Sequence, residues 1–404
     1  MRIQVLCPHF EPDSAPTGEF MSAIVNNLGE MGHELHVITA LPWYRNHAVE
    51  QGWDGQMTRT EQRPWGEITR VHPFPTDKTN IAARAAAFAG FTAIGLGSAV
   101  IDRFNPDVVF AMSPPLSLGV AGWLAAKRRR CPFVFNIQDV FPDVAIETGT
   151  ISNPKVIEVA KKLEKFVYDR ADVVTVLSEE MQRNVERKTD SATEIIPNFV
   201  DISTFEPMEK ENSYRREYGL EGKRVVMYCG NVGFSQSIEL LADAARQMTD
   251  IPDLVFVVNG GGSAIGEVRR RAEGLDNFRV IPYQPVERVP EVLSAADVHV
   301  IPLREGLAWS SVPSKLYKIL AVERPVVASV DEGTEVGRVV VEAGAGHSVP
   351  PDVVNPLVDS LRSILSSESE MEAMGSSGRA WVEQWTTPRR AAEAYESVFS
   401  RLIS

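Results

Sequence analysis

The stretch RVVMYCGNVGFSQSIELLADAARQM, residues 224–248, joins two different patterns through a short turn that contains glycine. An apolar run ends in GNVG, and helical spacing then returns with Ile238, Leu241 and Ala245 on one face. A buried strand, a tight turn and an amphipathic helix in this order form part of a βαβ unit. The stretch therefore predicts a parallel sheet with a helix packed against it.

The same rhythm of short Val- and Ile-rich runs and helical patterns continues on both sides of this stretch. The strands expected before it are IQVLC, ELHVITA, VVFAMS, FVFNIQD, VVTVLS and TEIIPN. The strands expected within and after it are VVMYCG, LVFVVNG, FRVIPY, VHVIPL, PVVASV and GHSVP. The sequence thus predicts an α/β fold of two tandem Rossmann-like, doubly wound parallel-sheet domains, with an interdomain cleft at the carboxyl ends of the strands.

The length supports two domains, because 404 residues exceed one ordinary hydrophobic core. We expect an N-terminal domain at 1–200, a polar linker at 201–223 and a C-terminal domain at 224–384. A helix at about 385–404 should pack back onto the first domain. The amphipathic tail contains four aromatic residues whose side chains should be buried: Trp381, Trp385, Tyr395 and Phe399.

Composition excludes several classes of function. A net charge of −13 argues against nucleic acid as a partner, since that affinity depends on Lys and Arg. The three cysteines are far apart and lie beside apolar runs, which is typical of buried, reduced thiols in the cytosol. The chain begins with a strand-like run rather than a signal peptide. The histidines show no metal-ligand spacing, so no metal site is expected.

The stretch LAWSSVPSKLYKILAVERPVVAS, residues 307–329, predicts an anion site at the start of a helix. Pro313 suits the first turn and has no N–H. The free donors of that turn would be the N–H groups of Ser314, Lys315 and Leu316. These donors, the helix dipole and an ammonium group suit a phosphate. The alternative is an ordinary capped helix with a surface lysine; the position after a strand favours phosphate.

Two further turns carry glycines. Gly230 and Gly233 would let the backbone approach a ligand and expose N–H groups, although such pairs also occur in ordinary tight βα turns. VVNGGGSAIGEV, residues 257–268, is not a dinucleotide fingerprint, because Ile265 stands where the last glycine of G-x-G-x-x-G should fall. The sequence therefore does not predict NAD or FAD binding.

Two loops of the first domain follow strands and would face the same cleft. CPHFEPDSAPTGEF, residues 7–20, leads into a helix through Thr17 and Gly18. FNIQDVFPD, residues 135–143, ends a strand at Gln138 and Asp139. A carboxylate there could orient a sugar hydroxyl, or it could serve as a cap or turn residue.

Two neighbouring stretches bear on membranes. Residues 81–101 are mostly apolar with one charge, while 127–130 are four cationic residues in a row. We expect the first stretch to be a buried helix, since it is too rich in Ala and Gly to span a bilayer. An interfacial helix beside a basic patch remains the alternative, with anionic lipid as the partner.

Taken in order, six blocks resemble family 4 glycosyltransferases of the GT-B fold, in the branch of colanic-acid, O-antigen or fucosamine-type transferases. The blocks are FEPDSAPTGEFMSAIVNNLGEMGHELHVITALP, SPPLSLGVAGWLAAK, FNIQDVFPDVAIETGTI, IIPNFVD, YCGNVGFSQSIELLADAA and SSVPSKLYKILAVERPVVAS. The resemblance implies a retaining, metal-independent transfer of a sugar from a nucleotide-diphosphate donor, with UDP favoured. The acceptor would be a cell-surface glycan, a lipid-linked sugar or a small molecule. No cofactor is implied, and the expected location is cytoplasmic, with peripheral contact at the inner membrane face left open.

The resemblance also implies roles for individual residues. Those assigned to the donor diphosphate are Thr17, Gly18, Gly230, Asn231, Gln236, Ser314 and Lys315. Those assigned to the nucleoside are Gly260, Gly261, Gly262, Pro282, Tyr283 and Lys318. Those assigned to the acceptor side are Glu19, Gln138 and Asp139. Asp139 and Lys315 are the expected catalytic residues.

The chain departs from the family pattern at two places. Asn231 and Gln236 replace an Arg and a Lys that many members carry, and Ser310 and Lys318 replace the E-x7-E pair. A lysine cannot accept hydrogen bonds from ribose hydroxyls, so either Lys318 makes a shifted contact to the sugar donor, or it faces solvent and other groups hold the ribose. Two other functions stay open: a UDP-sugar epimerase of the same fold, and an inactive nucleotide-sugar-binding subunit of a glycan assembly complex.

Overall fold

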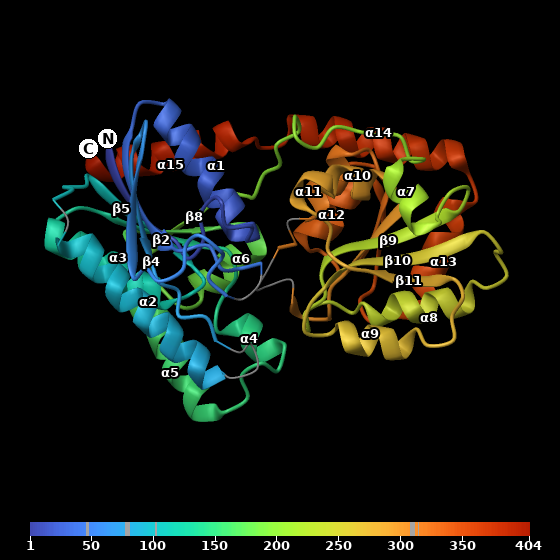
Figure 1. The fold of residues 1–404 in the computed structure, drawn as a ribbon, viewed down its shortest axis with the longest axis horizontal. Helices are drawn as coiled ribbons and strands as arrows, with labels where there is room; N and C mark the ends of the chain where they lie inside the picture. Colours follow the sequence, from blue (N-terminus) through green and yellow to red (C-terminus); the bar gives the residue numbers. More distant parts are fainter. Residues whose placement is uncertain (46–47, 77–80, 102, 308–311, 314) are drawn as a thin grey trace. The chain divides into compact units, whose positions relative to one another are not determined.

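The computed structural model describes residues 1–45, 48–76, 81–101, 103–307, 312–313 and 315–404. The chain divides into two compact units (Figure 1). Unit 1 comprises Met1–Asn198 and Pro388–Ser404, and unit 2 comprises Phe199–Thr387. Each unit has its own parallel sheet covered by helices, as the alternating sequence pattern predicts.

Unit 1 is built on an eight-stranded sheet in the order β3-β4-β2-β1-β5-β6-β7-β8. All neighbouring strands are parallel except the antiparallel pair β3 and β4. Its elements are β1 (Arg2–Leu6), α1 (Pro16–Glu30), β2 (Glu34–Ala40), β3 (Thr58–Arg63), β4 (Gly66–Val71), α2 (Ile81–Ile101), β5 (Val108–Ser113), α3 (Ser117–Arg129), β6 (Phe133–Ile137), α4 (Asp143–Glu147), α5 (Pro154–Tyr168), β7 (Val173–Val176), α6 (Glu179–Glu186), β8 (Ala192–Ile195) and α15 (Pro388–Ile403).

Unit 2 is built on a six-stranded parallel sheet in the order β11-β10-β9-β12-β13-β14. Its elements are α7 (Ser213–Tyr218), β9 (Arg224–Asn231), α8 (Glu239–Gln247), β10 (Leu254–Gly261), α9 (Ile265–Arg271), β11 (Phe278–Ile281), η1 (Val286–Arg288), α10 (Val289–Ser294), β12 (Val298–Pro302), α11 (Lys315–Ala321), β13 (Val326–Ser329), α12 (Glu335–Glu342), β14 (Gly346–Val349), α13 (Val354–Leu365) and α14 (Glu368–Gln384).

The strands with continuous apolar runs lie at the centres of the sheets. Every residue of β5 and β12 is buried, because helices cover both faces of a parallel sheet. The hairpin of β3 and β4 has no counterpart among the expected strands. In β3 buried residues are lacking and polar side chains alternate between half-buried and exposed, so its sequence carries no hydrophobic signal for a strand.

The segment expected to be a linker, 201–223, belongs instead to unit 2. It contains α7, whose Tyr214 is fully buried, and the nearby Leu220 is fully buried as well. Arg215 is also buried, where it donates to Asp297 Oδ2 at 2.6 Å and to the carbonyl of Ala295 at 2.8 Å. The charges that suggest a linker are therefore partly a buried ion pair that fixes α7 on the sheet.

The aromatic residues of the tail are divided between the units. Trp381 and Trp385 stay in unit 2, where Trp385 stacks on Tyr317 at 5.8 Å between ring centroids. The chain then returns to unit 1 as α15, which packs beside α1 (Figure 1). Tyr395 of α15 lies 4.8 Å from the ring of Phe110 on β5. The C-terminal helix thus completes the core of unit 1.

Helix α2 covers the stretch 81–101, where a buried helix is expected, and it is buried along one face. Its buried positions recur every fourth residue, at Ala87, Phe91, Gly95 and Ala99, and this stripe packs on α3 and β2. The opposite face is exposed, and Ile101 at its end is 83 % exposed. Among the helices of the described residues, none has the length and apolar character needed to cross a bilayer.

Candidate active site

The carboxyl ends of β9 and β10 approach each other closely in unit 2. Gly260 has φ +153°, and a Cβ there would lie 2.0 Å from the carbonyl oxygen of Gly230. Gly262 has φ +148°, and its Cβ would lie 2.4 Å from the carbonyl oxygen of Val232. Side chains cannot be accommodated at these positions, so glycine is required for the two loops to sit side by side.

The ammonium of Lys315, the first residue of α11, lies beside Gly230. Its Nζ would be 3.2 Å from a Cβ at Gly230, and it donates to the hydroxyl of Tyr228 at 2.7 Å. It also lies 3.9 Å from the centroid of the Tyr228 ring. Tyr228 in turn donates to the carbonyl of Asn231, which ties the ammonium to the turn after β9.

Burial lowers the pKa of Lys315 to about 8, and the nearby Cys229 raises it only in part. Within the described ranges, no carboxylate lies within 4 Å of this ammonium. Burial also raises the pKa of Cys229 to about 11, so its thiol stays neutral. Lys315 is therefore a half-buried cation beside Gly230, without a counterion of its own among those residues.

The start of α11 differs from the expected phosphate cradle. The N–H of Leu316 donates to the carbonyl of Pro313 at 3.4 Å, so it is engaged by the chain itself. Pro313 precedes the helix rather than lying in its first turn. Ser314 and Ser310 lie outside the described residues. Of the groups expected at this helix start, the ammonium of Lys315 is the one whose surroundings are described and lack an anion.

The turn after β9 is also more closed than its two glycines suggest. The N–H of Gly233 donates to Oε1 of Gln236 at 3.0 Å, so this donor is not exposed. Gln236 itself donates to Oγ of Ser235 at 2.6 Å. Gln236 therefore caps the turn, and Asn231 is the exposed polar residue beside Lys315.

The nucleoside-side residues cluster around the turn after β10. The hydroxyl of Tyr283 donates to the carbonyl of Gly261 at 2.6 Å and to Oδ1 of Asn231 at 3.4 Å. The ring of Tyr283 is 58 % exposed, and the preceding Pro282 is exposed too. Lys318 lies one turn beyond Lys315, with Nζ 5.0 Å from the ring of Phe205. Unit 2 thus brings together all of its described candidate residues except Lys318, whose ammonium lies near an aromatic ring.

Arg304, which the sequence analysis does not single out, holds the same turn from β12. Its guanidinium donates to the carbonyl of Phe234 at 2.8 Å and to Glu239 Oε1 at 2.6 Å. The signal for it is its place two residues after the end of a buried strand. Because Glu239 neutralises it, Arg304 positions the turn rather than supplying a free charge.

In unit 1 the candidate residues lie in the loops after β1 and β6. Thr17 and Gly18 form the first turn of α1, and Glu19 is exposed beside them. Asp139 is half-buried after β6. The amide of Gln138 is used within the unit: it donates to Asn136 Oδ1 at 2.9 Å, and its oxygen accepts from a neighbouring amide at 3.2 Å. Gln138 is therefore a structural residue as well as a strand-end residue.

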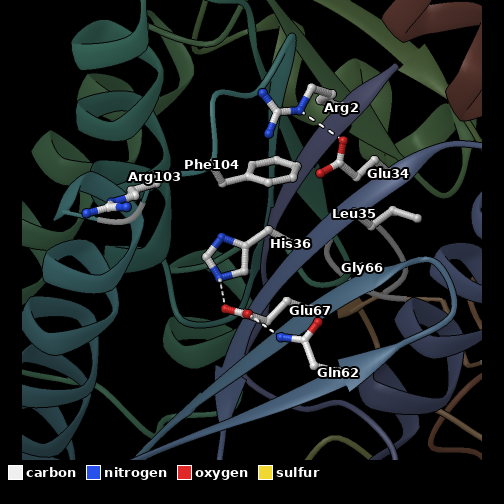
Figure 2. A pocket seen from close by; sticks show the side chains of 9 residues that line it. All are labelled: Arg2, Glu34, Leu35, His36, Gln62, Gly66, Glu67, Arg103 and Phe104. Atoms are coloured by element: carbon white, nitrogen blue, oxygen red, sulfur yellow. Dashed lines mark hydrogen bonds and ion pairs between the residues drawn. The ribbon is translucent and has the colours of Figure 1, made fainter.

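A separate hollow lies at the amino edge of the unit 1 sheet, with a volume of about 450 Å³ (Figure 2). Its polar groups bond one another: Arg2 pairs with Glu34 at 3.1 Å, and Gln62 donates to Glu67 at 2.6 Å. Nε2 of His36 lies 2.9 Å from the hydroxyl oxygen of Thr69, so this nitrogen is also engaged within the unit. Ligands of open α/β sheets bind at the carboxyl ends of the strands. This hollow lies at the amino ends, on the opposite edge of the sheet from the candidate residues of unit 1.

Two Rossmann-like units, with glycine-lined strand ends and a half-buried ammonium in the second, define a GT-B protein. Residues 17–198 match the glycosyl transferase 4-like domain, and residues 223–367 match the glycosyl transferases group 1 family. The chain belongs to the family 4 glycosyltransferases and is an enzyme of that class.

Similar proteins support this family and fold. The putative colanic acid biosynthesis glycosyl transferase WcaI of Escherichia coli is 27 % identical, over 90 % of this chain and 92 % of its own length. The probable glycosyltransferase WbjE of Pseudomonas aeruginosa is 25 % identical, over 76 % of each chain. Sucrose-phosphate synthase of Thermosynechococcus elongatus superposes with a TM-score of 0.78 at 18 % identity, covering 100 % of this chain and 99 % of its own. Anabaena HepE, solved with UDP-glucose, gives 0.74 at 15 % identity and covers both chains fully.

Proposed function

We propose that this enzyme moves a sugar, with retention of configuration, from a nucleotide-diphosphate donor to a hydroxyl of a glycan, lipid-linked or small-molecule acceptor. UDP-sugars are the favoured donors, and the reaction would run on the cytoplasmic side. The observation that carries the proposal is the ammonium of Lys315 beside Gly230, at the end of β9. The glycines let the two strand ends and the lysine come together, and the ammonium supplies the charge that a diphosphate needs.

The lowered pKa of Lys315 supports an anionic ligand. Burial without a counterion makes the charged form costly, and a bound diphosphate would remove that cost. Breaking a sugar–phosphate bond places negative charge on the leaving diphosphate, which a fixed ammonium stabilises. In the proposed step, the bond from the anomeric carbon to phosphate breaks and the bond to the acceptor oxygen forms. The hydroxyl proton passes to the leaving phosphate oxygen, and Asp139 would orient the acceptor.

The donor class is tested with purified enzyme and a panel of UDP-, GDP-, dTDP- and ADP-sugars. We expect UDP-sugars to give the largest rise in melting temperature. A ligand at a hundredfold excess over its Kd raises the free energy of unfolding by about 2.7 kcal/mol. NMR of the product should show the anomeric configuration of the donor sugar. Since Lys315 takes the role of a cation, rates in excess EDTA should equal those in magnesium. Inversion of configuration, or an activity restored only by metal, would contradict the proposal.

We also propose a peripheral contact between unit 1 and an anionic membrane surface. The exposed end of α2 carries Ile101, and Arg129 at the end of α3 donates to the carbonyl of Val100 at 3.3 Å, which joins the two helix ends. Residues 127–130 thus place basic side chains beside an apolar helix end. Flotation with phosphatidylglycerol vesicles should recover the enzyme, and Arg128→Glu with Arg130→Glu should abolish it. Equal flotation of the variant would refute this contact.

A further inference from the structure

The loop after β1 contains a histidine–carboxylate pair that the sequence analysis does not identify. Nδ1 of His9 lies 2.6 Å from Oδ2 of Asp13. The Asp13 side chain has no exposed surface, and its other oxygen accepts the N–H of Tyr44 at 3.1 Å. A buried carboxylate that also accepts a backbone N–H is held in place, so it fixes the orientation of the imidazole.

The second ring nitrogen of His9 is the unusual part of this pair. With Nδ1 protonated toward Asp13, Nε2 keeps its lone pair and acts as a hydrogen-bond acceptor. Within the part of the chain that the structure describes, His9 forms hydrogen bonds through Nδ1 alone, and 12 % of its side chain is exposed. A structural pair in the same unit behaves differently: His33 uses both nitrogens, with Glu396 at 2.8 Å and the amino terminus of Met1 at 3.0 Å.

Two aromatic rings flank the imidazole. Trp43 stacks on His9 with 5.6 Å between centroids and 26° between planes, and Tyr44 meets it edge-on at 5.3 Å. Burial, and next the charge of Asp13, raises the pKa of Tyr44, so its hydroxyl remains a neutral donor. Aromatic faces pack against the C–H faces of sugar rings, and a neighbouring acceptor nitrogen suits a sugar hydroxyl.

The loop that carries His9 is held rigidly by other parts of unit 1. Arg70 of β4, itself fully buried, donates to the carbonyl of Glu11, and the N–H of Glu11 donates to Ser22 Oγ at 2.9 Å. Phe10 is also fully buried. The hairpin of β3 and β4 thus explains how a proline-rich loop keeps one geometry, as a binding site requires.

The placement of the cluster matches the carboxyl edge of the sheet. His9 follows β1, and Trp43 follows β2, its parallel neighbour. Asp139 follows β6 at the same edge of the sheet. A Cβ at Gly18 would lie 2.9 Å from Cβ of His9, so the imidazole stands directly against the first turn of α1. The expected acceptor-side residues and the aromatic cluster therefore share one edge.

We propose that His9, Trp43 and Tyr44 form the subsite for the sugar unit of the acceptor. The Nε2 of His9 accepts a hydrogen bond from an acceptor hydroxyl, and the indole and phenol rings bound the sugar. Asp13 is a positioning residue that fixes the tautomer. The inference rests on the proposed glycosyl transfer, because the acceptor of such an enzyme presents sugar hydroxyls.

The test uses the full-length enzyme and methyl glycosides of glucose, galactose, mannose and N-acetylglucosamine, titrated with and without UDP by saturation-transfer NMR. His9→Ala should weaken the glycosides that bind by about tenfold, the effect of losing one hydrogen bond. The affinity for UDP should stay within about twofold, because Lys315, the cation proposed to hold the diphosphate, lies in unit 2. His33→Ala removes a histidine–carboxylate pair of the same kind and should leave both affinities unchanged.

Asp13→Asn separates positioning from folding. An asparagine amide would donate to Nδ1 and move the ring proton to Nε2, which then cannot accept the hydroxyl. The variant should bind glycosides about as weakly as His9→Ala, and ¹⁵N-histidine NMR should show the changed tautomer. The subsite is overturned when no methyl glycoside binds the wild type, when His9→Ala leaves glycoside affinity unchanged, or when it weakens UDP equally. The proposed transfer fails separately, through absence of UDP binding and turnover in the wild type.

Discussion

The carboxyl edges of the two sheets differ in the chemical groups that form them. In unit 2 the edge is backbone: Gly230 and Gly260 bring two strand ends together, and Lys315 adds one charge. In unit 1 the edge is made of side chains, with the His9–Asp13 pair held by a buried arginine and two rings. A backbone surface with one cation suits a diphosphate that many donors share, whereas a side-chain surface can vary with the acceptor.

In unit 2 the largest effect is expected from a substitution at Gly260, where β9 and β10 approach each other. A Cβ there would lie 2.0 Å from the carbonyl of Gly230, at a φ of +153°. We expect Gly260→Ala to lower the free energy of unfolding of unit 2 by about 4 kcal/mol, near the upper end for single substitutions. Urea unfolding followed by tryptophan fluorescence measures it.

The matched control for this substitution is Gly266→Ala in α9. A Cβ at Gly266 meets nothing within 4 Å, so alanine should raise stability by about 0.5–1 kcal/mol through helix propensity. Equal effects of the two alanines would show that the close approach of β9 and β10 is not required.

The charge of the unit 2 edge is tested by Lys315→Met. We expect UDP affinity to fall tenfold to hundredfold, about 1.5–3 kcal/mol, while uridine affinity stays the same. Isothermal titration calorimetry with both ligands makes the comparison. Equal weakening of uridine and UDP would place Lys315 outside the diphosphate site.

The same lysine predicts a pH dependence. Burial lowers its pKa to about 8, so the free enzyme carries the charge below that pH and loses it above. Phosphate binding favours the charged form, and the diphosphate is itself fully ionised above about pH 7. UDP affinity of the wild type should therefore be highest near pH 7 and fall as pH rises through 8, while Lys315→Met should show a flat profile there.

Lys318→Glu tests whether α11 carries a second charge for the sugar donor. Lys318 lies three residues after Lys315, so the two share roughly one face of α11. A glutamate at 318 would offset the positive charge of Lys315. UDP-sugar affinity should then fall by about three- to tenfold, which is the usual effect of a partly exposed charge pair, and the fall should be larger at low salt. A gain in affinity would instead show that a ribose-binding carboxylate is missing here.

The sequence predicts the parallel strands because their apolar runs are continuous. β2 and β5 begin and end where ELHVITA and VVFAMS do. The hairpin of β3 and β4 escapes prediction, since TRTEQR has no apolar face and is held by pairing rather than burial. The linker at 201–223 is misassigned because its charges are read as solvated, although Arg215 is buried.

The candidate site residues likewise fall into some that the sequence indicates and others that it does not. Lys315, Gly230 and Gly233 can be proposed as site residues from the sequence, since glycine and a strand–turn–helix order have a direct backbone meaning. The His9–Asp13 pair has only a weak signal, an H-x3-D spacing inside a proline-rich loop. What makes it a site is contact with Trp43, 34 positions away by the sequence numbering, and support from Arg70. Neither contact is encoded by local spacing.

The smallest effect comes from a feature that the two units share. The backbone turns left-handed just after a helix in each unit, at Glu323, two residues after α11, and at Arg130, the residue after α3, each with φ +57°. At α11 the N–H of Arg324 bonds the carbonyl of Ile319, and the N–H of Glu323 bonds that of Leu320. This pairing is the Schellman motif, whose left-handed residue is usually glycine.

A side chain in the left-handed region costs about 1–2 kcal/mol, and glycine removes that strain but loses about 0.4–1 kcal/mol through its freer unfolded chain. Glu323→Gly and Arg130→Gly should therefore each raise the free energy of unfolding of their own unit by about 0.5–1 kcal/mol. Glu323→Ala removes the same side chain without relieving φ and should give no gain. Thermal unfolding should register a rise of about 1–3 °C for each glycine variant, with UDP affinity unchanged. Since these caps lie outside both carboxyl edges, a glycine variant that altered binding would mean that each edge depends on its helix ends, and the contrast between a backbone edge and a side-chain edge would be too simple.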